Sequence, residues 1–188
     1  MHYKAILAFP ALLLACGGGD SQPATSESAA AVPTVYTVNY PVQYFAQRIG
    51  GDLVQVEFPA PSDEDPAFWT PDADAIAGYQ SADLILLNGA AYAKWLAVVS
   101  LPEARLVNTS AGFENRYISE ESAVTHSHGP GGEHSHEGTA FTTWLDPTLA
   151  VEHARAIKDA FTERWPDHAQ EFAFQYNDGL VHCPSPTT

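Results

Sequence analysis

The chain has 188 residues, with 23 acidic residues against 8 lysines and arginines, and its formal net charge is −15. Nucleic acids and anionic membrane surfaces are bound by basic footprints, so this composition argues against both as partners. With 45% hydrophobic residues, the part after the N-terminal leader can build one domain with its own core.

Residues 1–16 have the pattern of a lipoprotein signal peptide. Lys4 gives a short basic region, and the apolar run over residues 5–14 is too short to span a bilayer as a helix. The Leu-Leu-Ala-Cys sequence that ends at Cys16 resembles a bacterial lipobox, in which the cysteine is acylated. We therefore expect an extracytoplasmic protein, in the periplasm or on the cell surface, that is anchored to the membrane through lipid on Cys16 alone.

Residues 17–33 are small and polar and are expected to form a flexible tether. In the lobe that follows, over 34–146, β-branched and apolar runs alternate with helical spacing. The predicted strands are 34–38, 53–58, 83–87 and 105–108, and the predicted helices begin at Pro41, at Thr70-Pro71 and at Tyr92. This order is typical of an α/β fold, a single lobe with a parallel sheet flanked by helices.

Ligands of such sheets bind outside the carboxyl ends of the strands. Asn39-Tyr40, residues 59–70 and Asn88-Gly89 follow the first three predicted strands and should meet at that edge. In the second predicted helix, Ala73, Ile76 and Ala77 are expected to point inward.

A long C-terminal helix is predicted over 147–178. Asp146 can cap it, Pro147 can begin it, Pro166 interrupts its pattern and Gly179 should end it. Residues 179–188 are expected to be a disordered tail. His153 and His168 have charged neighbours, so we expect both on the helix surface.

The segment 125–138 is a histidine-rich loop. Two His-Ser-His pairs flank a Gly-Pro-Gly-Gly hinge, and the candidate metal ligands are His126, His128, His134 and His136, with Glu133 and Glu137 beside them. Neutral imidazole is the commonest protein ligand for zinc and other late divalent metals, so the loop predicts metal binding. The alternative is a polar, solvated loop that binds metal only adventitiously.

The chain resembles the N-terminal half of the zinc- and manganese-binding solute receptors of ABC importers. The motifs that carry the resemblance are the lipobox, Gly50-Gly51-Asp52, Asp65-Pro66 with Thr70-Pro71-Asp72, Ala82-Asp83 through Asn88-Gly89-Ala90 with Trp95-Leu96, and Trp144-Leu-Asp-Pro147. The resemblance implies a receptor that binds Zn²⁺, or another divalent metal such as Mn²⁺, as its solute and delivers it to an importer permease. In the family, a second lobe follows the long helix, and this chain ends before that lobe begins.

Two departures from the family pattern affect its metal site. The family has histidine where this chain has Ala67, and again where it has Thr142, so the usual site is not transferred to these positions. One interpretation is a rebuilt cleft whose candidate residues are Tyr40, Asp65, Trp69 and Trp144. The alternative is that these aromatic residues belong to the core or to a lobe interface.

These observations predict a lipid-anchored substrate-binding protein of a zinc or divalent-metal ABC importer, or a truncated form of one, which captures metal with its histidine-rich loop and is a monomer. Two alternatives stay open: a same-fold receptor that has lost the metal site and binds a non-metal ligand in an aromatic cleft, and a one-lobe metal buffer or sensor. No His-Glu-x-x-His, Gly-x-Ser-x-Gly or P-loop motif occurs, so no enzyme activity and no catalytic residue is predicted.

Overall fold

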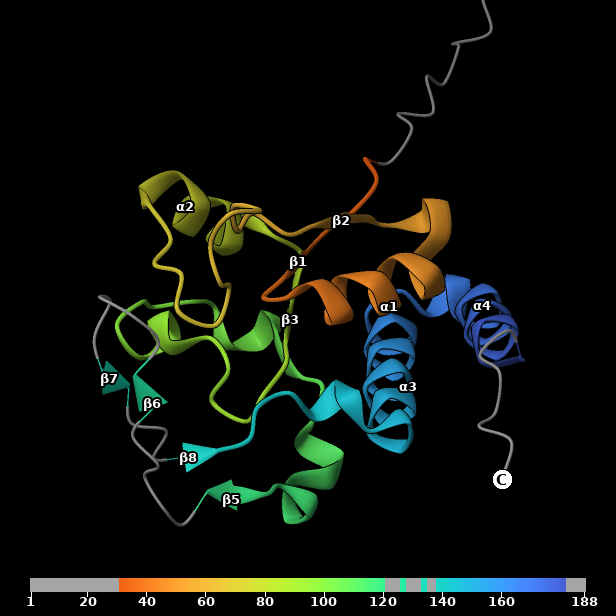
Figure 1. Ribbon diagram of the computed structural model, residues 1–188. Coiled ribbons are helices and arrows are strands. Elements are labelled where there is room, and N and C mark those ends of the chain that lie inside the picture. Colours follow the sequence, from red (N-terminus) through yellow and green to blue (C-terminus); the bar gives the residue numbers. More distant parts are fainter. Residues whose placement is uncertain (1–30, 121–125, 128–132, 135–137, 182–188) are drawn as a thin grey trace, which may run out of the picture. The chain divides into compact units, whose positions relative to one another are not determined.

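A four-stranded parallel sheet lies at the centre of the computed structural model, which describes residues 31–120, 126–127, 133–134 and 138–181 (Figure 1). Its strands, in spatial order, are β2 (Gln55–Glu57), β1 (Thr34–Thr37), β3 (Leu84–Leu87) and β4 (Leu106–Asn108). Within this sheet, Val35 of β1 is in register with Val56 on one side and with Leu84 on the other. The predicted α/β lobe with a parallel sheet is therefore confirmed.

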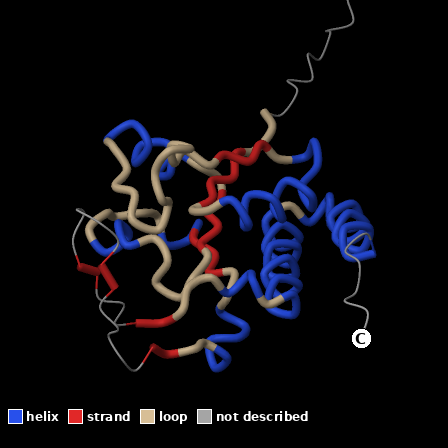
Figure 2. The backbone as a smooth tube through the Cα atoms, viewed as in Figure 1, coloured by secondary structure: helices blue, strands red, loops and turns tan. Residues whose placement is uncertain are grey.

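Helices cover both faces of this sheet (Figure 2). One face carries α1 (Tyr40–Gly50), α3 (Pro147–Arg164) and α4 (Ala169–Val181), and the other carries α2 (Ala73–Ser81) and the 3₁₀ turn η2 (Lys94–Ala97). Because α1 and α2 pass on opposite faces, the winding of the chain reverses between β1 and β3. Ligands of open α/β sheets bind at such a reversal, outside the carboxyl ends of the strands.

Short polar side chains begin the main helices. The carboxamide oxygen of Asn39 accepts the Val42 N–H at 3.0 Å at the start of α1, and that helix ends at Gly51, whose φ of +52° suits glycine. Asp146 accepts the Thr148 N–H at 2.8 Å and begins α3, as predicted.

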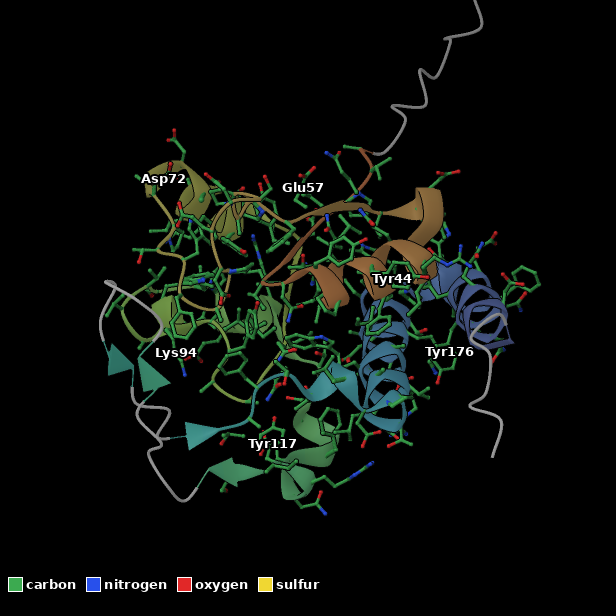
Figure 3. The ribbon with its side chains drawn as sticks, in the orientation of Figure 1. Tyr44, Glu57, Asp72, Lys94, Tyr117 and Tyr176 are labelled. Atoms are coloured by element: carbon green, nitrogen blue, oxygen red, sulfur yellow. The ribbon has the colours of Figure 1, made fainter. Side chains whose placement is uncertain are left out.

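The predicted start and inner face of α2 are wrong. Asp72, which is labelled in Figure 3, accepts the Ala75 N–H at 2.8 Å and caps the helix in place of Thr70. Ala73 and Ala77 are exposed, whereas Tyr79 is fully buried and donates its hydroxyl hydrogen to the Thr37 carbonyl at 2.7 Å. The large Tyr79 ring and its hydrogen bond thus determine which face of α2 points inward.

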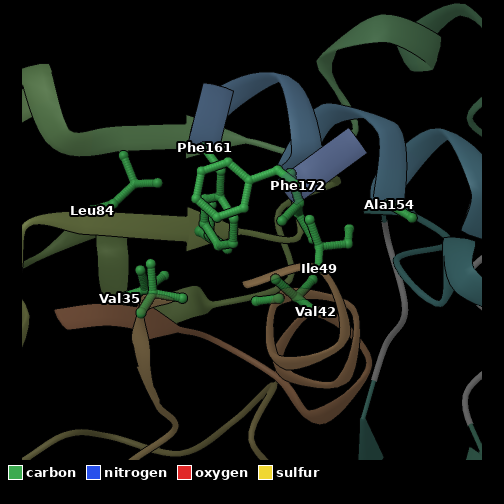
Figure 4. Close-up of a cluster of buried hydrophobic side chains, with 11 residues drawn as sticks. Val35, Val42, Ile49, Leu84, Ala154, Phe161 and Phe172 are labelled. Carbon is green, nitrogen blue, oxygen red and sulfur yellow. The ribbon is translucent and has the colours of Figure 1, made fainter. Parts of the chain in front are cut away.

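Each face of the sheet has its own apolar cluster. Along β3, Leu84 and Leu86 point to the face of α1, α3 and α4, and Ile85 points to the face of α2. In the first cluster the Phe161 ring of α3 lies 5.3 Å from the Phe172 ring of α4 (Figure 4). Strands that are apolar on both faces are expected of a sheet covered on both sides.

The interruption predicted at Pro166 is confirmed, whereas one continuous helix over 147–178 and its end at Gly179 are wrong. First, α3 ends at Arg164, and a 3₁₀ turn, η7 (Pro166–His168), turns the chain so that α4 packs back on α3. Pro166 has no N–H to donate and its ring clashes with the preceding turn, which ends α3. Second, α4 continues through Gly179 to Val181, because one glycine inside a helix costs only about 1 kcal/mol. Residues 182–188 of the predicted tail lie outside the described residues.

Short elements complete the described chain. The remaining 3₁₀ turns are η1 (Gly51–Leu53), η3 (Glu103–Arg105), η4 (Ala111–Arg116) and η6 (Thr143–Leu145). Two antiparallel pairs join β5 (Ser119–Glu120) to β8 (Gly138–Thr139) and β6 (His126–Ser127) to β7 (Glu133–His134). The predicted helix from Tyr92 is reduced to the turn η2. Among the described helices, none has the length and apolar character to cross a membrane.

Replacing Phe161 by alanine should test the first cluster. Phe161 is fully buried, so we expect Phe161→Ala to lower the free energy of unfolding by about 3–5 kcal/mol. Phe174 lies on α4 with 67% exposure, and Phe174→Ala is the matched control, with an expected change within about 0.5 kcal/mol. Urea unfolding measures both, and equal losses in the two variants would contradict this description of the core.

Candidate functional site at the carboxyl edge of the sheet

Two buried asparagines join the strand ends at the winding reversal. Asn39 follows β1 and Asn88 follows β3, and the Asn39 Nδ2 donates to the Asn88 Oδ1 at 3.0 Å. Asn88 in turn donates from its Nδ2 to the carbonyl of Phe141 at 3.0 Å and to that of Gly89 at 3.2 Å. The expectation that these two strand ends meet is confirmed, and the segment before α3 is joined to the same point.

The turn after β2 buries some of its side chains in the core and leaves others exposed on the surface. The Asp65 carboxylate accepts the Ala67 N–H at 3.0 Å, and the Asp65 carbonyl accepts the N–H groups of Phe68 and Trp69 at 3.0 and 2.9 Å. This turn buries Ala67 and Trp69, which are 1% and 8% exposed, and leaves Phe68 57% exposed. Trp69 therefore packs in the second apolar cluster and leaves little of its ring available to a ligand.

A row of aromatic rings crosses the edge between this turn and the start of α3. Ring centroids are 6.4 Å apart for Phe68 and Phe141, 5.3 Å for Phe141 and Tyr92, and 5.7 Å for Tyr92 and Trp144. Burial, followed by the negative charge of Asp65, raises the pKa of Tyr92 to about 12. The phenol of Tyr92 is therefore neutral at physiological pH and offers a hydroxyl group and no anion to a metal.

The four cleft candidates do not form one cluster. Asp65 and Trp144 belong to this edge, Trp69 is in the core beneath it, and Tyr40 is 65% exposed at the start of α1. No sequence signal marks Tyr92 and Phe141 as members of the row. The apolar spacing of Tyr92 predicts only a helix, and Phe141 precedes the Trp-Leu-Asp-Pro motif by three residues with no pattern of its own.

His153 is fully buried, so the expected surface position is wrong. Its Nδ1 lies 2.7 Å from the Thr109 Oγ1, and its Nε2 lies 2.8 Å from the Thr143 Oγ1. Thr109 already donates its one hydroxyl hydrogen to the Leu87 carbonyl at 2.7 Å, so the Nδ1 must carry the proton and donate it to Thr109. The Nε2 then accepts the hydroxyl hydrogen of Thr143.

This pair of hydrogen bonds holds α3 to the edge of the sheet. Thr109 follows β4 and Thr143 begins η6, and the neutral imidazole joins both while every polar atom involved is satisfied. Burial lowers the pKa of His153 to about 4. His153 is thus a structural histidine beside the candidate site, with neither ring nitrogen free to bind a metal.

The buried histidine should make the stability of the protein pH-dependent. The unfolded imidazole has a pKa of about 6.5, so the unfolded state binds more protons than the folded state between about pH 6.5 and pH 4. Stability from neutral His153 is complete above that range and is lost as the pH falls through it. We expect the free energy of unfolding to fall by about 2 kcal/mol from this group between about pH 7 and pH 5.

Denaturant unfolding at several pH values measures this loss. His153→Gln should abolish this pH-dependent loss of unfolding free energy. His168→Gln, at an exposed position on η7, should show the same loss as the wild type. Parallel pH profiles for the wild type and His153→Gln would show that the imidazole is not held neutral.

The histidine-rich loop lies mostly outside the described residues. Strands β6 and β7 are described as backbone, and their register pairs His126 with His134 and Ser127 with Glu133. The candidates His128, His136 and Glu137 fall on residues that are not described, as does Cys16. Among the described side chains, no group of three or more histidine, cysteine, aspartate or glutamate residues could hold a metal ion.

The two positions where the family pattern has histidine differ in their surroundings. Ala67 is almost fully buried in the second apolar cluster, and Thr142 is exposed at the start of η6. Neither side chain has a nitrogen to donate to a metal, so these two positions supply no imidazole ligand at this edge.

The lobe is a doubly wound α/β structure whose polar edge at the winding reversal is the place where such sheets bind ligands. The family model of ZnuA, the periplasmic component A of the zinc-uptake complex, matches residues 35–179. The chain belongs to this family, and the resemblance predicted from its motifs is confirmed.

Two curated relatives give the extent of the match. The chain is 31% identical over 174 residues to the high-affinity zinc uptake system protein ZnuA of Bacillus subtilis (strain 168), covering 86% of this chain and 51% of the relative. It is 26% identical over 171 residues to the iron-binding protein YfeA of Yersinia pestis, and this match covers 89% of this chain and 50% of the relative. The chain thus spans about half the length of the curated relatives it matches.

Solved structures agree on the fold. A crystal structure of ZnuA aligns with a TM-score of 0.65 at 24% identity over 80% of this chain and 54% of that one. The metal-dependent lipoprotein YcdH from Bacillus subtilis aligns with a TM-score of 0.63 at 22% identity over 79% and 51%. At these identities the likeness establishes the fold of the lobe and leaves the ligand open.

Proposed function

We propose that this protein is the solute-binding component of an ABC importer for a divalent metal, and that the metal is its cargo and not a catalytic cofactor. The observation that carries the proposal is the family match over residues 35–179, which spans both faces of the sheet and the C-terminal helices. The Bacillus relative is named for zinc uptake and the Yersinia relative for iron binding, which supports a divalent metal as the solute.

We place the metal on the histidine-rich loop. Alanine and threonine at the family's histidine positions leave the edge of the sheet without imidazole donors, and both nitrogens of His153 are engaged. The register of β6 with β7 supports the assignment, since it pairs His126 with His134. Directly opposed residues of an antiparallel pair have Cβ atoms about 4.5–5.5 Å apart, a separation that two zinc ligands can bridge.

Imidazole and carboxylate donors favour zinc and its neighbours among the late first-row metals. In this proposal His126 and His134 supply the first two nitrogens, His128 and His136 the others, and Glu133 and Glu137 add negative charge or oxygen ligands. Ordering such a loop around the metal costs conformational entropy, so its affinity is lower than that of a preformed site.

We also propose a cellular setting, which the periplasmic location of the family supports. The protein works outside the cytoplasm as a monomer and delivers its metal to an importer permease. Acylated Cys16 anchors it, and residues 17–33 give the lobe its reach from the membrane. The absence of the common hydrolase and nucleotide-binding motifs supports a binding role without catalysis.

A chelator-competed zinc titration tests the loop. Removing a group that only hydrogen-bonds to a metal ligand already weakens metal binding roughly 10- to 100-fold. Since His126→Ala/His134→Ala removes two ligands themselves, we expect it to weaken zinc binding by at least that much. His168→Ala, which removes an exposed histidine elsewhere, is the control and should leave the affinity unchanged. Equal affinity in the double variant and the wild type would exclude the loop as the metal site.

The two cysteines of the chain allow a matched test of the anchor. Cys16→Ser should move the protein from the detergent phase to the aqueous phase in a phase-partition assay and abolish labelling by a fatty-acid analogue. Cys183→Ser should behave as the wild type. Labelling that survives Cys16→Ser would overturn the lipobox assignment and leave the metal proposal untouched.

A further inference from the structure

A pocket of about 430 Å³ opens beside the winding reversal, on the η2 side of the sheet. Its lining includes Val38 and Leu87, at the ends of β1 and β3, and Asn108, at the end of β4. Its remaining walls come from the segment 88–97. This volume lies in the range of small-molecule sites, and the position is the one at which α/β sheets bind ligands.

The walls of the pocket are mostly apolar, and its two asparagines are already engaged. Asn88 is bonded to Asn39, to the Gly89 carbonyl and to the Phe141 carbonyl. Asn108 donates to Glu114 at 3.2 Å and accepts from the Ser110 hydroxyl at 2.9 Å. A ligand that needs side-chain amide partners would have to break these bonds, so the pocket favours an apolar body.

Lys94, which is labelled in Figure 3, is the charged residue among the described lining residues, and its side chain is exposed. Its Nζ lies 5.7 Å from the centre of the Phe141 ring, and no described carboxylate lies within 4.0 Å of it. By contrast, Lys158 also lies over a ring, that of Tyr176, but is paired with Asp159 at 2.5 Å. In a chain with a formal net charge of −15, a lysine without a carboxylate partner at the mouth of an apolar pocket is complementary to an anion.

The backbone of the pocket wall is strained. Gly89, Ala90 and Ala91 have φ values of +77°, +49° and +52°, a conformation that alanine rarely adopts. The Ala90 N–H donates to the Tyr117 hydroxyl at 3.3 Å, and a side chain at Gly89 would collide with Ser110 and Asn108. Strain of this kind persists where the surroundings enforce it, and it is concentrated at ligand sites.

We propose that this pocket binds a small organic anion with an apolar body, whose negative group pairs with the Lys94 ammonium. The proposal does not depend on the metal function, because no histidine is among the described residues that line the pocket. A carboxylate or sulfonate on a planar ring system matches its volume, its apolar walls and its single positive charge. Because the pocket is open to solvent, we expect a dissociation constant on the order of tens of micromolar.

The probe is 8-anilinonaphthalene-1-sulfonate, titrated by fluorescence into the full chain, with its uncharged analogue N-phenyl-1-naphthylamine alongside. We expect saturable binding of one sulfonate probe per chain, weakened by added salt because salt screens the charge pair. Lys94→Met keeps a side chain in contact with Phe141 but removes the positive charge. It should weaken binding of the sulfonate probe about two- to fivefold, the effect of losing an exposed ion pair, and leave binding of the uncharged analogue unchanged. Ala97→Trp, at an exposed position of the lining, should weaken both probes more than about tenfold.

Lys158→Met is the matched control, since it removes the same charge and the same kind of ring contact outside the pocket, and it should bind as the wild type. Ala97→Met is a smaller substitution that tests the same wall if the tryptophan variant does not fold. Binding unaffected by either change at Ala97 would place the probe elsewhere and overturn the proposal. If Lys94→Met changed the binding of the charged and uncharged probes equally, the proposed pairing of an anionic group with Lys94 would be wrong. Failure here would leave zinc binding by the loop unaffected, so the two proposals fail separately.

Discussion

Covering both faces of the parallel sheet is the constraint on which the rest of the described lobe depends. Strand β3 is apolar on both faces, and one of these faces is covered by α1, α3 and α4 together, with Phe161 and Phe172 at the centre. Placing α3 there draws the residues before it across the carboxyl edge, where the Phe141 carbonyl meets Asn88. The edge that carries the candidate site is therefore a consequence of how the core is closed.

A second consequence is the burial of His153 on the inner face of α3. A buried polar side chain is tolerated only when its hydrogen bonds are made, and here Thr109 and Thr143 make both. The imidazole thereby ties the end of β4 to the turn that precedes α3. Its neutrality is a requirement of this arrangement, because a proton on Nε2 would face a threonine that could no longer donate to it.

The sequence was sufficient for the sheet, the helix cap at Asp146 and the meeting of Asn39 with Asn88, because each depends on local spacing or on strand order. It was insufficient for His153, whose surroundings come from residues 44 and 10 positions away along the chain. The inner face of α2 was mispredicted for the same reason, since Tyr79 is oriented by a carbonyl of β1. Alanine rarely adopts positive φ, so the residue types at Ala90 and Ala91 do not predict the backbone conformation found there. The strained pocket wall beside Asn88 therefore could not be predicted.

The distribution of charge separates the two proposed binding regions chemically. The acidic chain pairs most of its described cations, as with Arg48 and Asp178, Arg116 and Asp146, Arg155 and Glu152, and Lys158 and Asp159. A surface that only attracted metal ions would gain nothing from a positive charge without a carboxylate partner, because that charge repels the cation. Within the described part of the chain Lys94 has such a charge, and it borders an apolar pocket whose amides are already engaged. Its place in the structure therefore fits an anionic ligand better than a cation. The histidine-rich loop has the opposite chemistry, with imidazole and carboxylate groups and no lysine or arginine over residues 125–138. The proposed cation site and the proposed organic-anion site thus have separate chemistries, and we expect substitutions that remove one to leave the other in place.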